Sequence, residues 1–95
     1  MIVKGETESG IQFQLDSRIK DDVRLIFLLT KASNTEDAME ASTCIMDLLT
    51  LIFGSDENVM VFMNEVADKH KGVCTAKEML AEITEMFDKL KAKNS

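Results

Sequence analysis

The chain lacks proline, tryptophan and tyrosine, and it has only four glycines among its 95 residues. Sandwiches and barrels contain many turns, and proline and glycine are the residues that punctuate them. Their scarcity therefore favours helices joined by short connections. Apolar residues still make up 45% of the chain, which is enough for one folded domain rather than a disordered segment.

Residues that commonly carry out catalysis or bind metals are also scarce. The chain has one histidine, His70, and two cysteines, Cys44 and Cys74, which do not form a C-x-x-C pair. A zinc site would lack ligands, and a Cys74–His70 pair would still need a third, orienting group. We therefore expect no enzyme, no metal and no cofactor. Lys69 and Lys71 flank His70, and we expect an exposed helix end there because cations are favourable at a helix C-terminus.

Basic residues are absent between Lys31 and Lys69, and the net charge is −6. This balance argues against a nucleic-acid partner and against an anionic membrane surface. The acidic stretch has two interpretations. It is either a solvated face or a surface that steers a basic partner or a second copy. The solvated face is the simpler interpretation, because exposed charge is the default state of a protein surface.

Long apolar runs are missing as well. No run approaches the roughly 18 residues that a membrane-spanning helix needs, and the start MIVKGETESG has no sustained apolar region of the kind found in signal peptides. The few cysteines suggest no disulfide framework. We expect a cytoplasmic protein in a reducing compartment.

The patterns that are present predict a strand-like start followed by helices. Ile11, Phe13 and Leu15 alternate with polar residues, as in a half-buried strand, and residues 1–4 can pair with them through the turn region 5–10. We expect one domain over 1–95, with a strand-like segment at 1–16, a helical bundle at 17–91 and a frayed tail at 92–95. The predicted fold class is mainly α, with about four helices in a small bundle and a short N-terminal strand or hairpin.

The first helix is expected from about Ser17 to residue 32, with Ser17 as its N-cap. The second is expected over 34–54, capped by Asn34 or Thr35 and ended by Gly54 in a left-handed conformation. The apolar residues of the first helix predict one broad buried face, made of Ile19, Val23, Leu25, Ile26, Phe27 and Leu29. Leu28 falls outside that face.

The third helix is expected to begin at Ser55 or Asp56 and to end near residue 72. Thr75 and Glu78 form a T-x-x-E capping box at the start of the fourth helix. The apolar stripe of that helix is Met79, Leu80, Ile83, Met86, Phe87 and Leu90. We expect its opposite, polar side to be exposed, and this side includes Glu82.

The second helix carries more apolar surface than a single neighbour can cover. Its apolar residues spread over roughly 240° at about 100° per residue, whereas packing on one neighbour needs little more than roughly 100°. A compact core with this helix at its centre is one explanation. We favour self-association, because excess apolar surface on a small acidic protein marks an interaction site. The candidate interface residues are Leu28, Met39, Met46, Leu51, Met60 and Val61.

Four segments resemble those of a known family. They are a start in which apolar and polar residues alternate (GIQFQLD), a helix that opens with charged residues (IKDDVRLIFLL), a strongly apolar helix that ends LIFG, and a capped last helix (TAKEMLAEITEMF). With its elements in this order, the chain resembles the tail assembly chaperones of long-tailed, siphophage-type bacteriophages. The resemblance spans most of the chain. It implies an all-helical subunit in the cytoplasm of a bacterial host that forms spiral homo-oligomers, coats the tape measure protein and assists polymerisation of the tail tube protein.

The resemblance brings no catalytic or cofactor residues with it. Spiral assembly requires a head-to-tail contact, whereas an isologous contact would stop at a dimer. The alternative is a small cytosolic regulatory adaptor, a discrete dimer that binds one partner through a Met-rich apolar face. Methionine suits either role because its side chain adapts to irregular surfaces.

Overall fold

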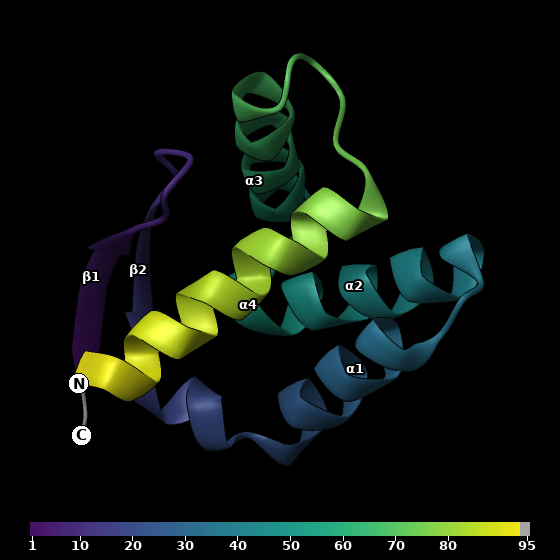
Figure 1. The fold of residues 1–95 in the computed structure, drawn as a ribbon. Coiled ribbons are helices and arrows are strands. Elements are labelled where there is room, and N and C mark those ends of the chain that lie inside the picture. Colours follow the sequence, from purple (N-terminus) through teal and green to yellow (C-terminus); the bar gives the residue numbers. More distant parts are fainter. Residues whose placement is uncertain (94–95) are drawn as a thin grey trace.

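The computed structural model describes residues 1–93. The chain begins with an antiparallel hairpin of β1 (Ile2–Glu6) and β2 (Gln12–Asp16), followed by the 3-10 helix η1 (Ser17–Asp21) and the helices α1 (Val23–Asn34), α2 (Ala38–Phe53), α3 (Asp56–Lys69) and α4 (Ala76–Lys93) (Figure 1). This arrangement confirms the predicted mainly α fold with an N-terminal hairpin.

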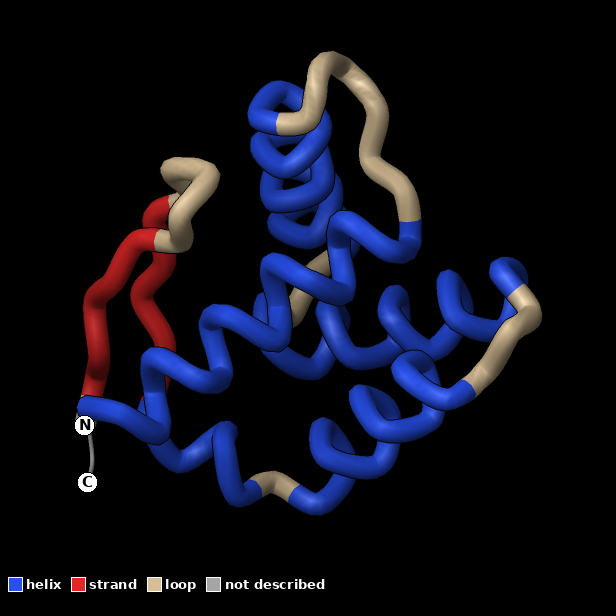
Figure 2. The backbone as a smooth tube through the Cα atoms, viewed as in Figure 1, coloured by secondary structure: helices blue, strands red, loops and turns tan. Residues whose placement is uncertain are grey.

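Helix α4 lies diagonally across the molecule and contacts the other three α-helices, η1 and β1. Helices α1 and α2 lie side by side and are joined by a short loop (Figure 2). Helix α3 leaves the end of α2 at an angle of 115°. One core is shared by the hairpin and all four helices, and it includes Leu15, Leu25, Leu49, Val66 and Met86.

The hairpin follows the alternation predicted from its sequence. Val3, Phe13 and Leu15 are buried, and their polar neighbours face solvent. Gly5 is opposite Phe13 in the register. A Cβ atom at Gly5 would lie 2.5 Å from Cζ of the Phe13 ring, so the ring can lie over the strand only because Gly5 has no side chain.

The first helix differs from the prediction, because it is broken at Asp22. The backbone of Asp22 is extended (φ −72°, ψ 116°), so this residue ends η1 and caps α1. The N-cap of η1 is Asp16, and the predicted cap Ser17 is buried instead. Each aspartate accepts hydrogen bonds from the backbone N–H and the guanidinium of the arginine two residues later, Arg18 or Arg24. The repeated D-x-R pattern therefore favours two short helices over one long helix.

These hydrogen bonds change the acidity of both caps. The guanidinium and the backbone N–H of Arg24 lower the pKa of Asp22 to about 2. Arg18 holds the pKa of Asp16 far below its usual range in the same way. Both caps therefore stay ionised under mildly acidic conditions.

The ends of α2 follow the sequence only in part. Its N-cap is Asp37, whose carboxylate accepts hydrogen bonds from the N–H groups of Met39 and Glu40, so the predicted caps Asn34 and Thr35 are wrong. Asp37 prevails because its side chain reaches two amides at once. At the other end, Gly54 has φ 85° and stops the helix as predicted.

The last two helices begin where the sequence indicates. Ser55 caps α3 and accepts a hydrogen bond from the Asn58 N–H. At α4 the capping box is complete, because Thr75 Oγ1 accepts from the Glu78 N–H at 3.1 Å and Glu78 Oε1 accepts from the Thr75 N–H at 3.2 Å. Helix α3 ends at Lys69, earlier than the predicted residue 72, and left-handed residues follow it.

Within residues 1–93, no single helix is long and apolar enough to cross a membrane. Helices α2 and α3 together have the length and composition of one span, but the chain bends between them.

Candidate interaction surface

Helix α2 is covered on only part of its apolar circumference. Its buried residues are Ala41, Cys44, Ile45, Leu48 and Leu49, which span roughly 140° at about 100° per residue. The remaining apolar arc, roughly 100° of the predicted 240°, carries the exposed or half-buried side chains of Met39, Met46, Leu51 and Phe53. The other helices therefore enclose α2 on several sides but do not cover it completely.

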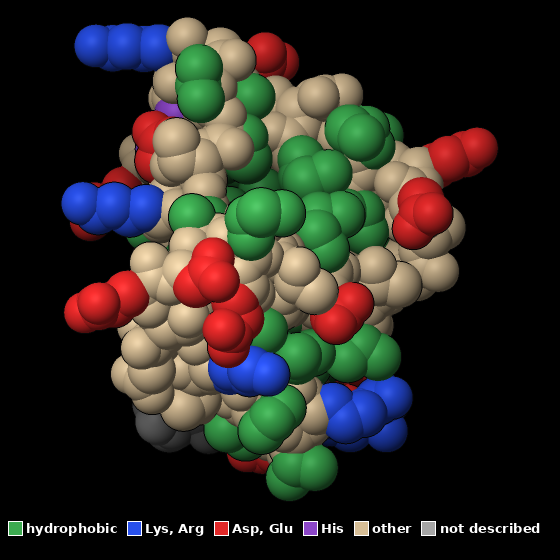
Figure 3. All heavy atoms as spheres, turned by 90° about the vertical axis from the view of Figure 1, so that its right-hand side faces the viewer, with side chains coloured by type: hydrophobic (Ala, Val, Ile, Leu, Met, Phe, Trp, Pro, Cys, Tyr) green, Lys and Arg blue, Asp and Glu red, His purple; other side chains and the backbone are tan. Residues whose placement is uncertain are grey.

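Large apolar side chains are exposed on α1, α2 and α3. Those found there are Val23, Ile26, Phe27, Met39, Met46, Leu51, Met60 and Val61. Exposed apolar residues scattered singly are normal, whereas contiguous groups mark interaction sites. Figure 3 shows that, on the side of the molecule it presents, hydrophobic side chains form a band across the middle and a second group toward the lower edge.

A cavity of about 170 Å³ opens between α2, the segment before α4 and α3. Its apolar lining consists of Ile45, Met46, Met63, Cys74, Ala76 and Met79, and it is called the methionine cavity below. Met79 is buried and Met46 is partly exposed. Burial raises the pKa of the Cys74 thiol, and the nearby Glu78 carboxylate raises it further. The thiol is therefore a neutral, apolar part of the lining at physiological pH.

A second apolar group lies on α1. Val23, Ile26 and Phe27 have the i, i+3, i+4 spacing that places them on one side of a helix, and the three together are called the α1 face. Phe27 is 63% exposed, and Lys31 Nζ lies 6.0 Å from its ring centroid. The prediction that these three residues are buried is wrong. The break at Asp22 sets the orientation of α1, and its buried residues are Leu25 and Ala32.

Five of the six candidate interface residues are exposed. The exposed fraction is 80% for Met39, 53% for Met60 and 58% for Val61, and Met46 and Leu51 are exposed to a smaller degree. Leu28 is the exception, because it is half-buried and packs against the core. The prediction that Leu28 falls outside the buried face of the first helix is therefore wrong, because Leu28 lies on the same side of α1 as Leu25. Its part in an interface stays a prediction.

The exposed candidates do not all line the same depression. Met46 lies at the methionine cavity. Val61 lines a different depression of about 230 Å³ between β2 and α3, together with Phe13, Phe53 and Phe62. Apolar surface is thus offered at more than one place, which suits a protein with more than one contact.

Glu82 is the clearest residue that sequence reasoning placed wrongly. It was expected on the exposed side of α4, but it is only 4% exposed. Its carboxylate accepts hydrogen bonds from Thr7 Oγ1 (3.0 Å to Oε1) and from Ser9 Oγ (2.9 Å to Oε2). Glu85 Oε2 accepts from the Glu8 N–H at 2.7 Å. These bonds join the loop of the hairpin to α4 across more than 70 residues of sequence, so no local pattern reveals them.

His70 also differs from the prediction of an exposed helix end. Its ring is half-buried, and Nδ1 lies 3.1 Å from Glu78 Oε2. The Thr75 hydroxyl and N–H lower the pKa of Glu78, and the His70 ring lowers it further. His70 therefore packs beside the capping box and helps join the end of α3 to the start of α4.

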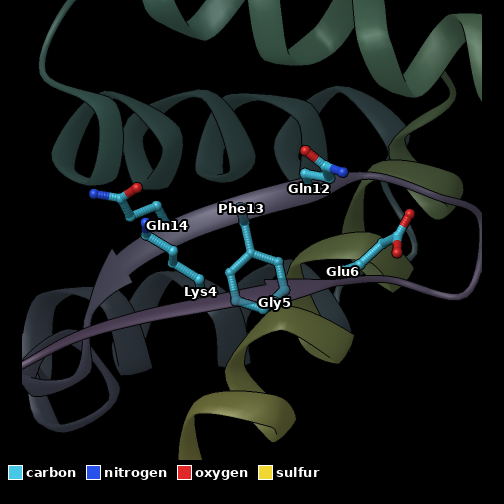
Figure 4. Close-up of a pocket in the computed structure, with 6 residues that line it drawn as sticks. All are labelled: Lys4, Gly5, Glu6, Gln12, Phe13 and Gln14. Carbon is cyan, nitrogen blue, oxygen red and sulfur yellow. The ribbon is translucent and has the colours of Figure 1, made fainter.

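Among residues 1–93, a depression of about 630 Å³ lies on the solvent face of the hairpin. Figure 4 shows that its polar side chains lie toward two ends, Lys4 with Gln14 on one side of Phe13 and Glu6 with Gln12 on the other, and do not meet at a common point. Small-molecule sites instead bring a few polar groups together around an apolar centre. Within the same residues, no group of three or more His, Cys, Asp and Glu side chains is placed to hold a metal ion.

Comparison with protein-family models, with characterised proteins and with solved structures found no match to this chain.

Proposed function

We propose that this chain is a non-enzymatic interaction protein that self-associates through its exposed apolar side chains. We further propose that it acts as a tail assembly chaperone of the family it resembles, coating a tape measure protein and assisting tail tube polymerisation in the cytoplasm of a bacterial host. The observation that carries the proposal is the apolar surface that α1, α2 and α3 leave uncovered, at the α1 face and at the methionine cavity.

The properties of this surface suit a chaperone of a long partner. Methionine side chains repack against different shapes without large cost, and Met39, Met46 and Met60 are all exposed. A tape measure protein would present many related but unequal apolar segments along one axis. A subunit that offers adaptable apolar contacts and also binds its own copies can repeat that contact along the axis.

The test is the molar mass in solution, measured by light scattering coupled to size exclusion across a hundredfold range of protein concentration. A mass that grows with concentration supports the spiral chaperone. One dimer at all concentrations supports instead the regulatory adaptor that binds through a closed interface. A monomer throughout contradicts self-association, because the apolar surface then needs no second copy.

The partner is tested by co-expression with a tape measure protein from a long-tailed phage. We expect the tape measure protein to stay in the soluble fraction and to co-purify with this chain. The matched variant Met39→Asp changes an 80% exposed side chain, so it should fold normally and show whether capture depends on the apolar surface. Unchanged insolubility of the tape measure protein beside the wild-type chain would contradict the chaperone proposal.

A further inference from the structure

We infer that the open edge of β2 is a docking site for an extended segment of another protein, which adds to the hairpin as a third strand. The docked segment carries one large apolar side chain, with lysine or arginine two positions before and after it. The site goes beyond the proposed function, because it involves neither the α1 face nor the methionine cavity.

The backbone of β2 has hydrogen-bonding groups that no other strand uses. Residues of an antiparallel pair alternate between those that bond to the partner strand and those whose N–H and C=O point away from it. The Thr7 N–H donates to the Ile11 carbonyl at 2.9 Å. The register that continues from this pair therefore directs the N–H and C=O groups of Gln12 and Gln14 away from β1. Within residues 1–93, nothing bonds to these outward groups.

The edge of β2 lacks the features that keep edge strands unpaired. Protected edges carry charged residues or proline, contain bulges, or are covered by another element. The exposed side chains of β2 are those of Gln12 and Gln14, which are uncharged. On β1 the exposed Lys4 and Glu6 are charged, and α4 contacts this strand. Figure 1 shows β2 on the side of the hairpin that faces α3, so a further strand would enter between β2 and α3.

The depression between β2 and α3 has room for one side chain of such a strand. It measures about 230 Å³ and is called the β2 groove below. The rings of Phe53 and Phe62, with centroids 4.9 Å apart, line it together with Val61. An apolar cavity of about 150 Å³ is large enough for benzene, so the groove accepts a leucine or phenylalanine side chain. Alternate side chains of a strand share one face, and the neighbours of this residue would point to solvent.

Charge determines which residues flank that apolar side chain. Glu57 and Glu65 lie one helical turn before and after Val61, on the same side of α3. Both are exposed, and neither carboxylate takes part in an ion pair or a hydrogen bond within residues 1–93. Four helical residues rise about 6 Å and two strand residues about 6.6 Å. Basic residues two positions from the apolar one therefore match the spacing of these carboxylates.

The basic residue of α3 does not neutralise this surface. Lys69 does not line the groove, and a Cβ atom at Gly10 would lie 3.3 Å from its Nζ. The ammonium group therefore lies at the loop of the hairpin. The unpaired charge beside the groove is negative, and it favours a basic segment over an acidic one.

The occupant is another protein and not a second copy of this chain. Among residues 1–93, Lys4 is the only basic residue in a strand, and the others lie in helices or in the connection between α3 and α4. A second copy therefore offers, in that range, no extended segment with basic residues on both sides of an apolar one. In strand addition the main-chain bonds provide affinity and the side-chain pocket provides specificity.

The probe for the test is the peptide Lys-Thr-Leu-Thr-Lys, acetylated and amidated at its ends. Its leucine and both lysines share one face of a strand, and threonine suits the solvent face. In NMR spectra of the isotope-labelled chain, the Gln12 and Gln14 amides should shift as the peptide is added. With nine in ten sites occupied, their hydrogen exchange should slow about tenfold, because only the free chain exchanges. Shifts confined to other elements, or no shift with millimolar peptide, would overturn the inference.

A proline variant tests the open edge itself. Gln14→Pro removes an outward N–H but none that bonds to β1, which is a position where sheets tolerate proline. It should bind the peptide about tenfold more weakly, because one peptide carbonyl loses its donor. Lys4→Pro is the matched control, since Lys4 is opposite Gln14 and its N–H points outward at the other edge. A Gln14→Pro chain that keeps its hairpin and binds as the wild type does would overturn the inference.

A charge variant leaves the backbone intact and decides the case if proline disrupts the hairpin. Glu65→Arg should weaken binding of the lysine peptide by about two- to fivefold. It should strengthen binding of Glu-Thr-Leu-Thr-Glu by a similar factor. Glu36→Arg makes the same charge change at an exposed position between α1 and α2, and it should change neither affinity. Equal effects of the two variants would mean that only net charge matters, and the site would be wrong.

Light scattering separates a failure of the docking site from a failure of the proposed function. Peptide binding by a chain that stays monomeric would contradict self-association and leave the docking site standing. A wild-type chain that assembles, with a Gln14→Pro variant that is folded but monomeric, would identify a second copy as the occupant and overturn the inference.

Discussion

Replacing Thr7 by valine should loosen the hairpin from α4, because it removes a buried hydroxyl that bonds both to α4 and to the loop of the hairpin. Its hydroxyl donates to Glu82 Oε1 at 3.0 Å and accepts from the Ile11 N–H at 3.1 Å. Valine has nearly the same shape, so the variant removes these bonds without opening a cavity. Thr7 is 4% exposed, and water therefore cannot easily replace the lost hydroxyl.

The expected loss follows from the two bonds. A hydrogen bond to a charged group contributes about 1.5–3 kcal/mol, and a buried amide left without an acceptor costs about 1–3 kcal/mol. The lowest values of these two ranges add up to a loss of about 2.5 kcal/mol in the free energy of unfolding. Small domains have only about 5–15 kcal/mol in total. For a chain of this size, the loss should lower Tm by about 10–20 °C.

The assay is urea unfolding followed by far-ultraviolet circular dichroism, because the chain has no tryptophan or tyrosine for fluorescence. Hydrogen exchange of the Ile11 amide reports on the hairpin itself. Thr84→Val is the matched control, since Thr84 is an exposed residue of α4, and it should change stability by less than about 0.5 kcal/mol. Equal stability of the two variants, with the Ile11 amide still protected, would refute the role assigned to Thr7 and Glu82.

Three further predictions concern single residues. Gly5→Ala should destabilise the protein by about 1–3 kcal/mol because its Cβ would overlap the Phe13 ring; calorimetry should show partial rescue in a Gly5→Ala, Phe13→Leu double variant. Thr75→Ala removes the hydroxyl that caps α4 and should cost about 1 kcal/mol in urea unfolding; no change would mean that the capping box contributes nothing. Asp22→Asn should be less stable than wild type at neutral pH. The pKa of Asp22 is lowered from 3.8 to about 2 in the folded chain, so its contribution is present above pH 3.8 and is lost as the pH falls through about 2; a Tm difference that did not shrink over that interval would contradict this assignment.

Local signals in the sequence predicted the boundaries that local chemistry controls. The T-x-x-E box starts α4, Gly54 ends α2, and the alternation at 11–15 forms β2. Each of these depends on residues within about four positions of one another, so the sequence contains the whole interaction. The D-x-R pair at Asp22 and Arg24 is also local. This pair indicates a break between two helices, but the apolar periodicity on both sides of it favoured the prediction of one longer helix.

The sequence by itself determined that the chain is mainly helical, that a strand-like segment precedes the helices, and that the apolar residues of the second helix exceed what one neighbour can bury. Periodicity and capping are enough for these conclusions, because they describe each element alone. Only the tertiary structure decided which apolar residues stay uncovered. Leu28 and Phe27 are adjacent on one helix, yet Leu28 packs against the core and Phe27 is exposed, because the break at Asp22 and the position of α4 set the orientation of α1. The burial of Glu82 and the methionine cavity likewise arise from residues far apart in the chain, whose meeting depends on how the helices pack.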